Sequence, residues 1–137
     1  MILRVRRMLL GVLIAGTIGT AAELMLTGHT EEVWQQLPIG LLAAAVPVAA
    51  IVAIRPLRGA VTLLQILMVI FIAAGLLGAY FHYHGNAEFA RELTPGLAGF
   101  DLLKEAMTRQ TPPPLAPGTM ILLGLIGLIC CYGENTK

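Results

Sequence analysis

Charged side chains are scarce in this sequence. Only 12% of its 137 residues are Asp, Glu, Lys or Arg, about half of the roughly 25% found in soluble domains. Apolar residues take their place, since 57% of the chain belongs to the set AVILMFWYC. A soluble fold of this size and composition would expose large apolar areas to water. The composition therefore excludes an ordinary soluble domain and predicts a membrane protein whose first partner is the lipid bilayer.

Basic clusters and cysteines are also nearly absent. The net charge is +1, and no cluster of Lys and Arg follows the N-terminal segment. The sequence therefore lacks the basic surface that nucleic-acid binding requires. The two cysteines, Cys130 and Cys131, are adjacent within an apolar run. They give no disulfide framework, and we expect them to be small buried residues.

The long apolar stretches predict the fold class. A helix crosses a hydrocarbon layer of ~30 Å with roughly 20 apolar residues. We expect Pro38 to be the first helical residue of the second stretch, and Arg55 and Pro56 to end it. The expected fold is all-α, a four-transmembrane-helix bundle that forms a single integral membrane domain over residues 1–137. The four expected spans are residues 8–27, 38–54, 59–81 and 117–133.

The basic residues predict the orientation of these spans. Cytoplasmic loops carry an excess of Lys and Arg. Six of these residues lie near the two termini or in the turn between spans two and three, whereas three lie between spans three and four. We therefore expect both termini to be cytoplasmic, in a bacterial inner membrane. The six are Arg4, Arg6, Arg7, Arg55, Arg58 and Lys137, and the three are Arg91, Lys104 and Arg109.

The first apolar segment also has features of a secretory signal. Three arginines precede it, and cleavage after Ala22 would be compatible with its small residues. Its apolar core continues through Leu26, which is longer than the usual core of about 7 to 15 residues. We expect it to remain as an uncleaved anchor helix.

The outer segment, residues 82–116, is too long to be a simple turn. We expect Gly85 to end span three in a left-handed conformation and Asn86 to cap a separate short helix over residues 87–93. A second helix over residues 100–109 is amphipathic, which is typical of an interfacial helix in the headgroup plane. Its apolar face consists of Phe100, Leu103 and Met107.

Small residues recur at every fourth position on spans one and three. Such ridges allow close approach of helices in lipid, and a polar residue on a ridge faces other helices. We expect these ridges to be close-packing surfaces, and their positions allow the polar ends, Glu23 and His82, to meet, either as a functional pair or as a contact that fixes helix register. The ridges are Gly11, Ala15 and Gly19 before Glu23, and Ala74 and Gly78 before His82.

Histidines and carboxylates gather in the two outer loops. These side chains ligate transition metals such as zinc, copper or iron. Within this set His84 and Glu88 share a helix face only if helix continues through Gly85. A hydrogen-bonded polar layer at the membrane surface explains the same residues, so both interpretations stay open. The candidate metal ligands are Glu23, His29, His82, His84 and Glu88.

Residues 82–92, followed by LAPGTMILLGLIGL, resemble small four-span bacterial membrane proteins, a resemblance that implies no particular activity. The short chain with a carboxylate in span one is similar in layout to the small multidrug transporters. In that family the glutamate lies near mid-membrane, whereas Glu23 lies near the end of its span.

These features lead to one expected function and two alternatives. We expect a non-catalytic accessory or structural subunit of a membrane complex, respiratory or photosynthetic, that packs against other membrane subunits or against itself. The first alternative is a metal-binding or metal-handling protein with its site on the extracytoplasmic face. The second is a small proton-coupled transporter that works as a dimer through Glu23.

Overall fold

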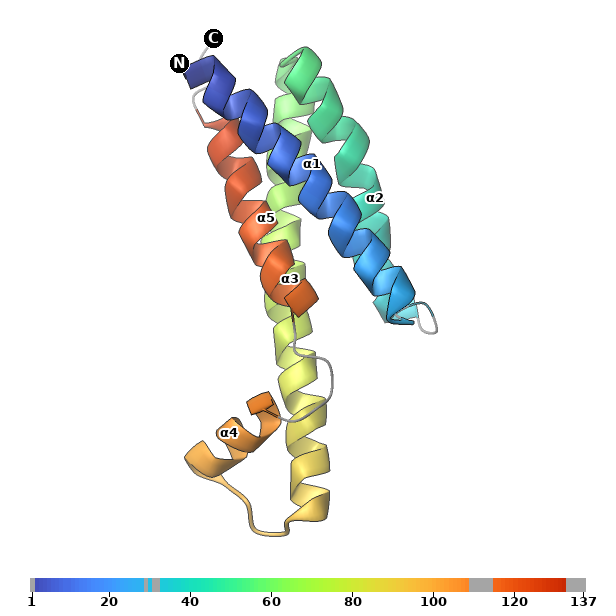
Figure 1. Cartoon of the computed structure of the whole chain (residues 1–137), viewed down its shortest axis with the longest axis vertical. Helices are drawn as coiled ribbons and strands as arrows, with labels where there is room; N and C mark the ends of the chain where they lie inside the picture. The colour runs from blue at the N-terminus through green and yellow to red at the C-terminus, as the bar shows by residue number, and fades with distance from the viewer. Residues whose placement is uncertain (1, 29, 31–32, 109–114, 133–137) are drawn as a thin grey trace.

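The computed structural model describes the whole chain except residues 1, 29, 31–32, 109–114 and 133–137. The described part is all-α and contains no strand. Helices α1, α2, α3 and α5 lie side by side (Figure 1). The short helix α4 lies outside this group, beside the end of α3. The helices are α1 (Ile2–Leu26), α2 (Val33–Ile54), α3 (Arg58–Leu93), α4 (Gly99–Thr108) and α5 (Leu115–Cys131).

Three of the described helices are long and apolar enough to cross a membrane. They span Arg4–Leu26, Val33–Ile54 and Arg58–Leu93, and Leu115–Cys131 is a shorter apolar helix. Large apolar side chains cover their outer surfaces, which suits contact with lipid rather than water. The chain is therefore a small helical membrane protein, as its composition predicts.

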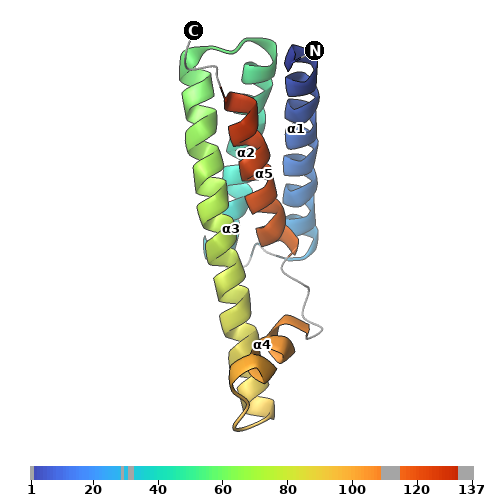
Figure 2. The same ribbon diagram turned by 90° about the vertical axis from the view of Figure 1, so that its left-hand side faces the viewer.

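The helices run alternately up and down the bundle. The start of α1, the turn from α2 to α3 and the end of α5 lie at one end, as two perpendicular views show (Figures 1 and 2). At this end Arg6 Nε donates a hydrogen bond to the carbonyl oxygen of Cys130, at 2.8 Å. At the opposite end α3 extends beyond its neighbours and carries α4 beside it (Figure 2).

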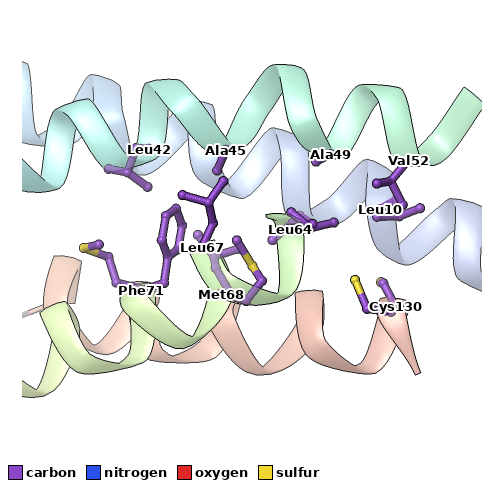
Figure 3. Packing of buried hydrophobic residues seen from close by; sticks show 14 of the residues in the cluster. Leu10, Leu42, Ala45, Ala49, Val52, Leu64, Leu67, Met68, Phe71 and Cys130 are labelled. Atoms are coloured by element: carbon purple, nitrogen blue, oxygen red, sulfur yellow. The ribbon is translucent and has the colours of Figure 1, made fainter. Parts of the chain in front are cut away.

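The core lies between α1, α2, α3 and α5. Phe71 and Leu67 of α3 point toward Leu42 and Ala45 of α2, and Cys130 is buried near the end of α5 (Figure 3). Cys130 and Cys131 form no disulfide and both are buried, as their apolar surroundings in the sequence predict.

Glycines bring α3 and α5 into close contact. A Cβ on Gly75 would lie 2.6 Å from the carbonyl oxygen of Pro117, and a Cβ on Gly124 would lie 2.7 Å from that of Met68. A Cβ on Gly127 would collide with the Met68 side chain. Only glycine permits this approach of the two backbones, so the small residues of these two helices serve helix packing.

The small ridge of α1 does not make the expected contact within the described chain. Gly11, Ala15 and Gly19 are exposed, and nothing lies within 4 Å of a Cβ placed on either glycine. The α1 face that packs inward instead carries Leu10, Leu13 and other residues of the core. The same face carries Thr17 and Thr20, which are buried, and Gly16, where a Cβ would lie 2.7 Å from the Leu123 side chain.

Two expected helix boundaries were wrong. Helix α2 begins at Val33, so Pro38 lies inside it rather than at its first position. Helix α3 continues without interruption through Gly85 to Leu93, and Gly85 does not adopt a positive φ.

Packing against α4 explains why α3 continues. Asn86 is no cap, because its Nδ2 donates to the carbonyl oxygen of Ala106 in α4, at 3.0 Å. Ala87 and Ala90 are buried against the same helix. These contacts offset the loss of helix propensity at glycine and asparagine, which is about 1 kcal/mol or less per residue.

Candidate functional site

The five candidate metal ligands lie in different surroundings. His29 is outside the described residues. Glu23, near the end of α1, is exposed, whereas His82 is half-buried in α3. His84 and Glu88 are exposed on α3, where His84 Nδ1 and Glu88 Oε1 are 3.5 Å apart.

The continuous helix separates the histidines that are closest in sequence. Residues that are two positions apart in an α-helix differ in direction by about 200° around the helix axis. His82 and His84 therefore point to opposite sides of α3. In the described part of the chain, no three His, Cys, Asp or Glu side chains form a group that could hold a metal ion. The metal site that includes His29 and the pairing of Glu23 with His82 both stay predictions.

His82 instead lines a cavity of about 550 Å³. Its walls come from the last turn of α1, the first turns of α2 and α5, and the middle of α3. This volume is within the range of about 300 to 1,000 Å³ that is typical of small-molecule sites. The bundle thus contains a ligand-sized cavity at the end from which α3 projects.

One face of α3 forms the longest wall of this cavity. Its residues are spaced by three or four positions and end in the imidazole of His82. Gln35 of α2 is the other polar side chain among the described lining residues, and Trp34 lies beside it. The α3 residues are Ala74, Leu77, Gly78, Phe81 and His82.

The described lining of the cavity is mostly apolar. It includes no carboxylate, thiol or amine, and its polar side chains are His82, Gln35 and the indole of Trp34. An apolar wall with a few polar groups at one end suits an amphipathic ligand.

A second candidate surface lies on the projecting segment. We call residues 86–108, which comprise the end of α3 and all of α4, the arm. Leu102 and Ala106 of α4 pack on Ala87 and Ala90 of α3. Several larger apolar side chains stay outside this small core and are exposed. They are Phe89, Leu93, Phe100, Leu103 and Met107.

The sequence predicted part of this surface. Phe100, Leu103 and Met107 do form an exposed face of α4. The packing of Leu102 and Ala106 on α3 was missed, although both are apolar residues one turn apart. The cavity was also missed, and the stripe from Ala74 to His82 was its only visible signal.

No family model, curated protein or solved structure matches this chain.

Proposed function

We propose that this protein is a non-catalytic accessory subunit of a membrane complex and that it docks on its partner through the arm. The observation that carries the proposal is the exposed apolar face of the arm, where Phe100 is 76% exposed.

The arm lies beyond the length that a membrane span needs. Helix α3 has 36 residues, about 54 Å at 1.5 Å per residue, whereas the hydrocarbon layer is ~30 Å thick. Phe89 lies about 45 Å along the helix from Arg58. Its side chain and those of α4 therefore lie beyond the acyl chains when Arg58 is at the opposite membrane surface.

The direction of the arm favours a protein partner over the membrane surface. The end of α3 continues along the long axis of the bundle, and α4 lies beside it rather than across the end of the bundle (Figure 2). Exposed apolar side chains in that position are stabilised when the extramembrane part of a neighbouring subunit covers them. A second copy of this chain is one possible neighbour, and the mass of a cross-linked product identifies it.

Four spans and cytoplasmic termini complete the proposal. Helix α5 has 17 residues, about 26 Å, and packs along α3, so it serves as the fourth span of a slightly thinned bilayer. Arg4, Arg6 and Arg7 are in the first turns of α1, and Arg55 and Arg58 are at the turn from α2 to α3. These two parts of the chain lie at the same end of the bundle (Figure 1). This charge distribution supports a bacterial inner membrane with both termini and the α2–α3 turn in the cytoplasm.

Site-specific photo-cross-linking in native membranes tests the docking. Leu103 and Asp101 are both exposed, and their spacing places them on opposite sides of α4. We expect a photoreactive residue at Leu103 to give one discrete protein product and the same residue at Asp101 to give little. Cross-links from Leu103 to lipid alone, or equal products from both positions, would contradict the proposal.

The metal-handling alternative is supported by the His84–Glu88 pair alone. Elemental analysis of protein purified in mild detergent tests it. A metal held by this pair should be lost in His84→Ala and retained in His82→Ala, because the two histidines lie on opposite sides of α3. The transporter alternative predicts that Glu23→Gln abolishes proton-coupled uptake in vesicles.

A further inference from the structure

We propose that the cavity between α1, α2, α3 and α5 binds an amphipathic molecule that has an apolar chain and an anionic phosphate or carboxylate head. The apolar chain would lie against Ala74 and Met120, and the head would lie beside His82 and Gln35.

The cavity lies across the boundary of the hydrocarbon layer. Measured along α3 from Arg58, Ala74 lies at about 24 Å and His82 at about 36 Å, and the hydrocarbon layer is ~30 Å thick. Tyr80 and Trp34, which lie near the same end of the bundle, are exposed, as is typical of aromatic residues at the membrane surface. The cavity therefore has one end at acyl-chain depth and the other at headgroup depth.

The polarity of the residues that line the cavity changes with their depth in the membrane. At the deep end Ala74 and Met120 are apolar, and at the shallow end His82 and Gln35 carry hydrogen-bonding groups. An imidazole has two ring nitrogens and an amide has two donors and an acceptor. Each side chain can thus bond to a headgroup in addition to a contact within the chain.

Two helix N-termini favour a negative charge at this end. The first turns of α2 and α5 both contribute to the wall, through Gln35 and Ala116. The first N–H groups of a helix lack intrahelical partners and carry a partial positive charge. The described lining residues include no carboxylate that would oppose an anion. Glu31 and Glu32, which precede α2, lie outside the described residues.

The cavity is open to the surroundings of the bundle. Trp34, Leu77 and Phe81 line it and are at the same time more than half exposed. A lipid can therefore enter from the side, without passage through water. This opening distinguishes the cavity from a closed packing defect, which would have only buried walls.

The single tryptophan makes this proposal testable, because Trp34 lines the cavity and is the only tryptophan in the chain. The protein is purified in mild detergent and titrated with lipids whose acyl chains carry bromine, which quenches tryptophan fluorescence. The probes are dibrominated phosphatidylglycerol, phosphatidylcholine with the same chains, and dibromostearate. We expect saturable quenching by the anionic probes at mole fractions about tenfold lower than phosphatidylcholine requires.

The two anionic probes distinguish the sources of the headgroup. Tighter quenching by phosphatidylglycerol identifies a membrane phospholipid, and tighter quenching by dibromostearate identifies a free fatty acid. Either result supports the proposed chemistry. Quenching by all three probes that rises without saturation and to the same extent would mean ordinary contact of Trp34 with the micelle and would overturn the proposal.

Matched variants separate the site from general lipid contact. His82→Gln keeps a hydrogen-bonding side chain but cannot become positive, and we expect it to reduce the preference for the anionic probe by about tenfold. His84→Gln, on the opposite side of α3, should leave that preference unchanged. Equal effects of both variants would contradict the role of His82.

A second pair of variants tests the apolar end of the cavity. Ala74→Leu fills the deep wall and should abolish the saturable quenching. Ala73→Leu adds the same volume at an exposed position of α3 and should not. Circular dichroism verifies that each variant keeps its helix content. Retained saturable quenching in a folded Ala74→Leu variant would overturn the location of the acyl chain.

Discussion

Arg6 in α1 donates from Nε to the carbonyl oxygen of Cys130, the penultimate residue of α5, at 2.8 Å. The last carbonyl groups of a helix lack intrahelical partners and carry a partial negative charge. The Arg6 guanidinium of α1 thus supplies a hydrogen-bond partner for a carbonyl group at the end of α5. At the same end of the bundle, Cys131 Sγ donates a weaker hydrogen bond to the carbonyl oxygen of Val61, in the first turn of α3, at 3.9 Å.

Replacement of Arg6 should therefore loosen this end of the bundle. We expect Arg6→Ala to lower the free energy of unfolding by about 1 to 2 kcal/mol, because a charge-assisted hydrogen bond to a partly buried carbonyl is lost. Thermal unfolding in mild detergent measures the change. Arg7→Ala is the matched control, since Arg7 is exposed. A similar loss in both variants would assign the effect to net charge rather than to the contact with Cys130.

The contact of α3 with α5 should depend on Gly75. A Cβ at this position meets the Pro117 backbone, which cannot rotate away, so we expect Gly75→Ala to destabilise the protein by about 1 to 3 kcal/mol. Gly19→Ala adds a methyl group to open space and should stabilise α1 by about 0.5 to 1 kcal/mol. Unfolding midpoints of the two variants should move in opposite directions. Destabilisation by Gly19→Ala would indicate that the α1 ridge contacts a second chain.

The attachment of α4 should depend on Asn86. Loss of the hydrogen bond to Ala106 in Asn86→Ala should increase amide hydrogen exchange in α4. The same change should slow exchange around position 86 in α3, because alanine is the better helix former. Glu92→Ala, at an exposed position of α3, should leave α4 unchanged. Unaltered exchange of α4 in Asn86→Ala would show that Leu102 and Ala106 hold it without the amide.

Cysteine labelling should establish the orientation. We expect a cysteine at Lys104 to react with a membrane-impermeant reagent added from the periplasm, and one at Arg58 to react only after permeabilisation. The native Cys130 and Cys131 are buried, and the unaltered chain gives their background. Periplasmic labelling at position 58 would reverse the proposed topology.

The sequence predicts the helices of this fold better than their ends. Apolar length identifies α1, α2, α3 and α5 because burial in lipid acts on every residue of a span. Pro38 and Gly85 are weaker signals, since each acts on one or two hydrogen bonds. Contacts made elsewhere override them, as the bond from Asn86 to Ala106 does in the arm.

The candidate site was less predictable for a physical reason. Residue type identified His82 and His84 equally, but a helix places them on opposite sides, so only the packing of α3 against its neighbours decides which one lines the cavity. The ridge of α1 shows the same limit. Spacing places Gly11 and Gly19 on one face, and only the neighbouring helices decide whether that face is inside.

The uninterrupted helix α3 forms one wall of the cavity and continues into the arm. Because the helix is continuous, a partner that displaced its end at Phe89 or Leu93 would also displace the segment that carries His82. The shape of the cavity would then differ between the free and the docked protein. Linkage then requires that an occupant of the cavity alter the affinity for the partner by the same factor as the partner alters the affinity for the occupant.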